Sequence, residues 1–283
     1  MLISDIDEHA PVMGLFKGES GTGKTTAACT FPRPIKVWSL DDRMKSVAMY
    51  LKKHEMASDI EIMAVGPQDF VRFIDDFGKT ADPYSQAAMF HDGRQFKTFV
   101  LDGLTSLGTM ILQYCISVRG SKTKERCKGI IKLPEIDDFM GESNALEKIL
   151  SYARKINETA NFIMTAHEVE AKSFDITTKT THESRSLLTG GSKVAAKVPI
   201  YFDEVWHFEA ETEYTEDGTR SAYKVLTQHA GRDFARTSLP LPAVMDWTGG
   251  TLWQDVEKFL PPKPDDGVVD AETQINTLTQ GDE

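Results

Sequence analysis

The sequence predicts an α/β fold in which helices cover both faces of a mostly parallel central sheet. Three observations lead to this prediction. Short apolar runs alternate along the chain with longer segments of helical spacing. A glycine-rich segment, residues 18–25, stands between the first apolar run and the first helical segment. Acidic or histidine side chains follow later apolar runs, at the positions where parallel strands end and ligands bind.

The composition is that of a soluble globular protein, with 283 residues of which 40% are hydrophobic and 27% charged. This length suits one large α/β domain or two small ones. The net charge of −11 argues against wholesale coating of nucleic acid, but it is compatible with a local basic groove. Three cysteines without a C-x-x-C pair predict reduced thiols and a cytoplasmic location. No apolar stretch approaches the roughly 20 residues of a membrane span, so we expect no membrane partner.

The glycine-rich segment fits the phosphate-binding pattern G-x-x-x-x-G-K-[ST]. Its glycines permit positive φ and bring successive N–H groups around an anion. Lys24 would hold the β- and γ-phosphates of ATP, and the Thr25 hydroxyl would ligate Mg²⁺. The alternative is an ordinary glycine turn, but an apolar run before the segment and a helical run after it favour a nucleotide site. The residues predicted to bind the nucleotide are Gly18, Glu19, Ser20, Gly21, Thr22, Gly23, Lys24, Thr25 and Thr26.

The first half of the chain continues the alternation of strand and helix. Strands are predicted over residues 12–16, 35–40 and 60–65, and helices over residues 24–29, 44–51 and 68–78. A further apolar run, residues 97–101, ends at Asp102. A carboxylate at a strand end, about 80 residues after a phosphate loop, is typical of the second half of a nucleotide site. There it would hold the Mg²⁺ shell.

In the second half, helices are predicted over residues 104–118, 143–160 and 251–260, with Ser143 as the cap of the second helix. Strands are predicted over residues 162–167, which end at His167, and over 204–209 and 222–228. Two irregular segments lie between these elements, a basic stretch over 119–132 and a long polar loop over 171–193. The basic stretch has six basic residues and one acidic residue, a net charge of +5. Residues 261–283 have six acids and one lysine, which predicts a disordered acidic tail after an ATP-binding domain over residues 1–260.

The order of these elements resembles the RecA-like recombinase core of the P-loop NTPases. The resemblance rests on the phosphate loop, the acid pair Asp41-Asp42 after the next strand, the single Asp102, and Thr165-Ala166-His167 at a later strand end. More closely, the chain resembles the short, phage-encoded single-strand annealing ATPases of the Sak type, over roughly residues 12–260. This resemblance implies a Mg²⁺-dependent, DNA-stimulated ATPase that acts in DNA recombination, by annealing or pairing single-stranded DNA.

The resemblance also implies roles for individual residues. Lys24 and Thr25 would bind phosphate and Mg²⁺, and Asp102 would be the acid of the metal shell. Asp42, with Asp41 as the second choice, would activate the attacking water, although the recombinases usually have Glu there. The acid pair would otherwise cap the following helix. His167 would sense the γ-phosphate and report to a DNA-binding loop, or it would be an ordinary histidine at a strand end.

Two irregular stretches, residues 119–142 and 171–193, match the positions of the family's mobile DNA-binding loops. The cations predicted to bind single-stranded DNA are Lys122, Lys124, Arg126, Lys128, Lys172, Lys179 and Arg185. The alternative for the basic stretch is a solvated surface. Family members complete the site with a cation from the neighbouring subunit, for which Arg232 and Arg236 are the candidates, so the resemblance implies a homo-oligomer. A single-strand DNA-binding protein is a further expected partner, and the location would be the host cytoplasm for a phage-encoded chain.

Three other functions compete with this interpretation. Another P-loop motor or an AAA+-type helicase loader would share the phosphate loop, but it should have an Asp-Glu pair where this chain has Asp102-Gly103. A small-molecule kinase would need an arginine-rich lid close to the phosphates. The third is a non-enzymatic, nucleotide-gated switch that binds ATP without turnover.

Overall fold

The computed structural model describes residues 10–41, 43–82, 84–85, 89–118, 127–128, 131–132, 134–175, 180–189, 192–215, 218–230, 234–247 and 251–260. Its centre is a nine-stranded sheet with the order β13-β12-β11-β1-β9-β6-β2-β3, to which β10 adds by pairing with β9. Two further pairs of short strands, β4 with β5 and β7 with β8, stand apart from it. No helix in the described part of the chain is long and apolar enough to cross a membrane.

The strands of the main sheet are β1 (Met13–Gly18), β2 (Ile35–Ser39), β3 (Ile60–Ala64), β6 (Thr98–Asp102), β9 (Asn161–Asp175), β10 (Thr180–Leu187), β11 (Glu204–Thr215), β12 (Gly218–Leu226) and β13 (Val244–Asp246). The short strands are β4 (Phe90–His91), β5 (Arg94–Gln95), β7 (Cys127–Lys128) and β8 (Ile131–Lys132). The helices are α1 (Lys24–Ala28), α2 (Met44–Lys53), α3 (Phe70–Thr80), α4 (Leu104–Val118), α5 (Ile136–Asn157), α6 (Ser192–Lys197) and α7 (Leu252–Glu257), with 3₁₀ turns η2 (Pro67–Asp69) and η5 (Val198–Tyr201).

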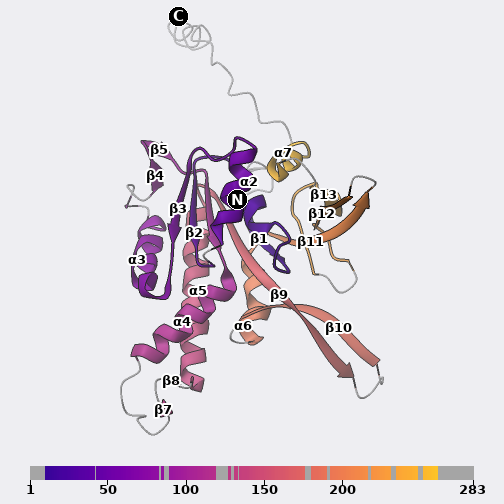
Figure 1. The fold of residues 1–283 in the computed structure, drawn as a ribbon. Helices are drawn as coiled ribbons and strands as arrows, with labels where there is room; N and C mark the ends of the chain where they lie inside the picture. The colour runs from indigo at the N-terminus through magenta and orange to yellow at the C-terminus, as the bar shows by residue number, and fades with distance from the viewer. Residues whose placement is uncertain are drawn as a thin grey trace, which may run out of the picture.

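Six neighbouring strands of the sheet are parallel, which confirms the predicted fold class. The parallel pairs are β11 with β1, β1 with β9, β9 with β6, β6 with β2, and β2 with β3. At one end the sheet becomes antiparallel, through β12 and β13. Figure 1 shows this sheet at the centre of the molecule, with the β9–β10 hairpin extending beyond the other strands.

Helices cover both faces of the sheet because successive strand residues point to opposite sides. Phe99 and Leu101 of β6 belong to a core that α3, α4, α5 and α6 cover, whereas Val100 between them belongs to a core that α1, α2 and α7 cover. Phe162 and Ile163 of β9 divide in the same way. Strands that are buried on both faces consist of continuous apolar residues, which is why these strands could be predicted from the sequence.

The helix predicted over 143–160 begins earlier, at Ile136, and Ser143 does not cap it. The N-cap is Glu135, whose backbone N–H donates to the Asp138 carboxylate at 2.8 Å. Acidic side chains in the first turn favour a helix start. The interpretation of residues 136–142 as part of an irregular stretch is therefore wrong.

Residues 171–193 do not form the predicted long loop. Strand β9 continues to Asp175 and pairs with β10 in an antiparallel register that runs from Leu187 opposite Glu168 to Thr180 opposite Asp175. Helix α6 then begins at Ser192. Threonine is a good strand former, but the segment shows no apolar alternation because the hairpin extends away from the core. Its polar composition is therefore that of a hairpin that extends beyond the other strands and not of a loop.

A candidate nucleotide site at the strand ends

The carboxyl ends of four parallel strands meet at one edge of the sheet and carry the polar residues of the site. Ser39 of β2 lies opposite Asp102 of β6, and Asp102 lies opposite Thr165 of β9. Gly18, at the end of β1, lies opposite His167 of β9. This register brings the phosphate loop, the acidic strand ends and the histidine together, as the sequence predicted.

The glycines of the phosphate loop have the conformation that was predicted for them. Gly18, Gly21 and Gly23 have φ angles of +146°, +85° and +85°. A Cβ at Gly18 would collide with the carbonyl oxygen of Phe208, and one at Gly23 would collide with the indole ring of Trp247. Gly18 and Gly23 are therefore required by both conformation and close approach, and Gly21 by conformation alone.

The Lys24 side chain is buried and folds back over the loop. Its Nζ donates to the carbonyl oxygens of Gly18 at 3.0 Å and Glu19 at 2.5 Å, and it lies 3.3 Å from the Thr22 hydroxyl. Burial lowers the pKa of Lys24 to about 8, although nearby carboxylates work to raise it. These partners are uncharged, so phosphate oxygens would replace them with stronger, charge-assisted hydrogen bonds.

We expect ATP binding to weaken as the pH rises through about 8. Only the protonated Lys24 ammonium attracts phosphate, and bound phosphates would hold the proton on it, so the dissociation constant should rise by at most about tenfold per pH unit above that pKa. Titration of a fluorescent ATP analogue across this pH range measures the effect. Lys45→Ala, at an exposed lysine of α2, should show the wild-type profile, and a wild-type affinity that is constant across the range would contradict the prediction.

Thr25 and Asp102 provide a hydroxyl and a carboxylate that fit a magnesium site. The Thr25 hydroxyl donates to Oδ1 of Asp102 at 2.6 Å, and the Thr165 hydroxyl donates to the same oxygen at 2.7 Å. Burial raises the pKa of Asp102, against the effect of these two hydrogen bonds. A cation beside this carboxylate is therefore favoured, and hydroxyl and carboxylate oxygens are ligands that Mg²⁺ accepts.

Asp41, two residues after the end of β2, is the second acid of the site. Its carboxylate accepts a hydrogen bond from the Ser106 hydroxyl and lies 3.4 Å from Nε2 of His167. Burial works to raise the pKa of Asp41, but the hydrogen bonds from His167 and Ser106 outweigh burial and hold the pKa below its ordinary value. A cavity of about 550 Å³, lined by both Asp41 and His167, leaves room for water at this point.

Gly103 explains why Asp41 can lie beside Asp102. Its φ is +110°, and a Cβ there would come within 2.6 Å of Oδ1 of Asp41. An acid after Asp102, as in the Asp-Glu pair expected of the AAA+-type rival, would occupy the space that the Asp41 carboxylate fills. The second acid of this site therefore comes from the neighbouring strand end.

The sequence did not single out Arg43, which the structure places at the phosphate loop. Arg43 is exposed, and its Nη1 donates to the Ser20 hydroxyl at 3.1 Å. Its positive charge also helps to lower the pKa of Asp41. An arginine directly before a helix is common in sequences, so only its contact across the loop marks it.

A buried charged network lies behind the loop. Nζ of Lys17 is 2.5 Å from Glu168, whose other oxygen is 2.6 Å from Nδ1 of His207. Nη1 of Arg185 is 2.6 Å from Nε2 of the same ring and 3.2 Å from Glu209. Nε2 of His207 also lies 3.2 Å from the carboxylate of Glu209, so an arginine donor and a carboxylate acceptor both face this ring nitrogen. The side chains of Lys17, Glu168 and His207 are 1–3% exposed.

Glu168→Ala is expected to destabilise the fold by about 3–5 kcal/mol, because it leaves the buried Lys17 ammonium unpaired. Burial works to raise the pKa of Glu168, but His207 and Lys17 outweigh it and the pKa falls below its ordinary value. The stabilisation that Glu168 provides is thus present above its unfolded pKa and is lost as the pH falls through its folded pKa.

Urea unfolding measures both the cost of Glu168→Ala and this pH dependence. Glu211→Ala removes an exposed pair with Lys224 and should cost at most about 1 kcal/mol. Equal losses in the two variants would contradict the prediction.

The structure gives the position of some of the other predicted residues and does not describe the rest. Arg185 was predicted to bind DNA, but its side chain is only 12% exposed and contacts His207 and Glu209. The guanidinium of Arg236 donates to the carbonyls of Pro199 and Phe202. Lys128 lies in β7 and Lys172 in β9. Asp42, Lys122, Lys124, Arg126, Lys179, Arg232 and residues 261–283 lie outside the described residues.

Comparison with known proteins agrees with this geometry. A family model described as an AAA domain matches residues 10–237, which contain the phosphate loop, both acidic strand ends and His167. No curated protein matches the chain.

Proposed function

This chain belongs to the AAA domain family, and on that premise we propose that it hydrolyses ATP in order to anneal or pair single-stranded DNA. The observation that carries the ATPase activity is the meeting of Lys24, Asp102 and Asp41 at one edge of the sheet. Mg²⁺ held by Thr25 and Asp102 would neutralise charge on the phosphate oxygens. The DNA activity rests on the resemblance to annealing ATPases and on the basic residues of the sequence stretch 119–132.

The arrangement assigns a task to each side chain of the site. Lys24 would exchange its loop carbonyls for the β- and γ-phosphate oxygens, and the loop N–H groups would surround them. Asp41, ionised at neutral pH, would orient water from the adjoining cavity toward the γ-phosphorus. The water oxygen bonds to phosphorus as the bond to the β–γ bridging oxygen breaks, and the products are ADP and phosphate.

The β9–β10 hairpin supports an action that nucleotide controls. His167 and Glu168 lie side by side in β9, one against Asp41 and the other in the buried network with Lys17. The same strand then runs out into the hairpin shown in Figure 1. A change at the phosphates would therefore act on the base of the hairpin. Most of the hairpin lies within residues 171–193, the segment that matches the position of one DNA-binding loop in the resembled family.

The ATPase rate with and without single-stranded DNA tests this function. We expect the DNA to raise the rate, with the effect falling steeply as salt rises. A preference for duplex DNA would favour another motor or a helicase loader. Tight ATP binding without turnover would favour a switch, and a requirement for a small acceptor would favour a kinase.

Replacing Lys122, Lys124, Arg126 and Lys128 by alanine should weaken single-stranded DNA binding about equally for all sequences. The slope of log affinity against log salt should flatten by about 0.7 for each DNA phosphate that these cations no longer neutralise, and DNA-independent hydrolysis should stay unchanged. Fluorescence anisotropy of a labelled oligonucleotide at several salt concentrations measures the slope. Lys45, Lys52 and Lys53 of α2, replaced together, are the matched control. An unchanged affinity and slope in the quadruple variant would show that the basic stretch is only a solvated surface.

A further inference from the structure

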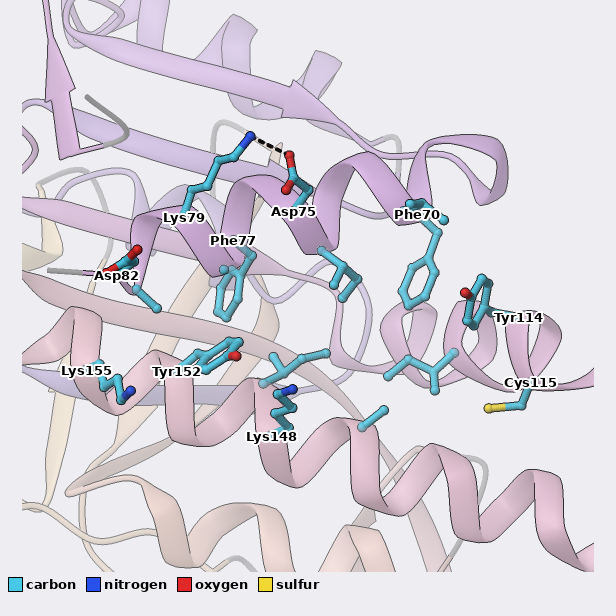
Figure 2. A pocket seen from close by; sticks show the side chains of 17 residues that line it. Phe70, Asp75, Phe77, Lys79, Asp82, Tyr114, Cys115, Lys148, Tyr152 and Lys155 are labelled. Atoms are coloured by element: carbon cyan, nitrogen blue, oxygen red, sulfur yellow. Dashed lines mark hydrogen bonds and ion pairs between the residues drawn. The ribbon is translucent and has the colours of Figure 1, made fainter. Parts of the chain in front are cut away.

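A second cavity, of about 710 Å³, lies away from the phosphate loop, between α3, α4 and α5. Phe77 of α3 and Tyr152 of α5 approach each other across it, as Figure 2 shows, and Ile111 of α4 contributes to the apolar lining. Two of its lining residues, Val71 and Tyr114, are 63% and 44% exposed. Its volume lies within the range of roughly 300–1,000 Å³ that is usual for binding pockets. None of these residues takes part in the proposed ATPase chemistry.

The two edges of this groove differ in charge. On the α5 edge, Lys148 and Lys155 are exposed, and each ammonium lies 5.7 Å from the centre of the Tyr152 ring. Neither lysine forms an ion pair with any residue that the structure describes. On the α3 edge stand Asp75 and Asp82, and Asp75 is paired with Lys79, which turns away from the groove in Figure 2. The positive charge available to a ligand is therefore on the α5 side.

We propose that this groove is the docking site for an amphipathic helical segment of a partner protein, with apolar side chains on one face and carboxylates next to them. The apolar side chains would enter the groove beside Tyr152 and the exposed Val71 and Tyr114, and the carboxylates would pair with Lys148 and Lys155. Helix α3, which forms one wall of the groove, has eleven residues and is about 16 Å long, which matches about three turns of a docked helix. A flat anionic membrane fits less well, because the groove is concave and Asp82 stands on its other edge.

Three synthetic peptides of about 12 residues test the proposal. They share one apolar face of leucine and phenylalanine and carry glutamate, glutamine or lysine beside it. The full chain should bind the glutamate peptide roughly fivefold or more tightly than the glutamine peptide, and the lysine peptide weakest. In the double variant Lys148→Glu and Lys155→Glu the order should invert. Lys52→Glu and Lys53→Glu on α2, a helix of the opposite core, should leave the order unchanged.

Several outcomes would overturn the proposal. These are equal affinity for the three peptides, no effect of the charge reversal, or no binding of the glutamate peptide at all. Binding seen only after truncation at Leu260 would assign the groove to this chain's own C-terminal residues. Loss of self-association in Ile74→Glu, without peptide binding, would assign it to a second copy, and loss of binding to anionic vesicles in the double variant would assign it to lipid. ATP hydrolysis should be unchanged in the double variant, which separates this result from a failure of the proposed function.

Discussion

Lys24→Ala is expected to abolish ATP hydrolysis, with a loss of about 10³-fold or more, and to weaken ATP binding. The physical reason is that the Lys24 ammonium lies inside the phosphate loop, bonded to the carbonyls of Gly18 and Glu19. Two other cations near the loop are not placed to replace the Lys24 ammonium. Nζ of Lys17 is bound to Glu168 in the buried network, and Arg43 contacts the loop from outside, at Ser20.

Phosphate release measures the hydrolysis, and calorimetry measures the binding. The matched control is Lys45→Ala, which removes an exposed ammonium from α2 and should retain wild-type turnover. Urea unfolding of Lys24→Ala separates a lost function from a lost fold, since Lys24 is buried. A folded Lys24→Ala variant with near-normal turnover would contradict the ATPase assignment itself.

The fold and the phosphate loop were predictable because their signals are local. Strands such as Thr98–Asp102 are buried on both faces and read as unbroken apolar runs. Positive φ at Gly18, Gly21 and Gly23 follows from glycine at that spacing. Asp102 was found because it ends such a run, and the register then places it opposite Thr165.

What the sequence did not reveal depends on contacts between distant segments. Thr165 and Ser106 are ordinary hydroxyl residues until the fold places them on Asp102 and Asp41. The β9–β10 hairpin was missed because its Thr- and Ser-rich strands leave the core and need no apolar face. The charge and position of Arg185 predict a DNA cation, whereas the fold turns its side chain into the network around His207.

We propose Asp41, the second choice from the sequence, as the water-activating acid. The sequence favoured Asp42, which lies outside the described residues, so that prediction stays untested. Asp41 has the contacts that the role requires. It is held by Ser106 and His167, it lies over Gly103 beside Asp102, and it faces the cavity of about 550 Å³. It also lies close enough to Lys24 to affect the pKa of that ammonium.

Asp41→Asn is therefore expected to lower the turnover number by about 10²-fold or more while ATP still binds. The amide keeps the shape and can still bond Ser106, but it cannot accept a proton from water. Asp42→Asn makes the same change one residue later and should retain most of the turnover.

The lowered pKa of Asp41 keeps its carboxylate ionised at neutral pH, so the wild-type rate should fall only as the pH drops through that lowered value. Steady-state kinetics over pH, with ATP binding measured separately, tests both variants. If Asp41→Asn retains turnover and Asp42→Asn loses it, the acid is Asp42, and the pair of Asp41 with His167 serves only to hold the strand ends together.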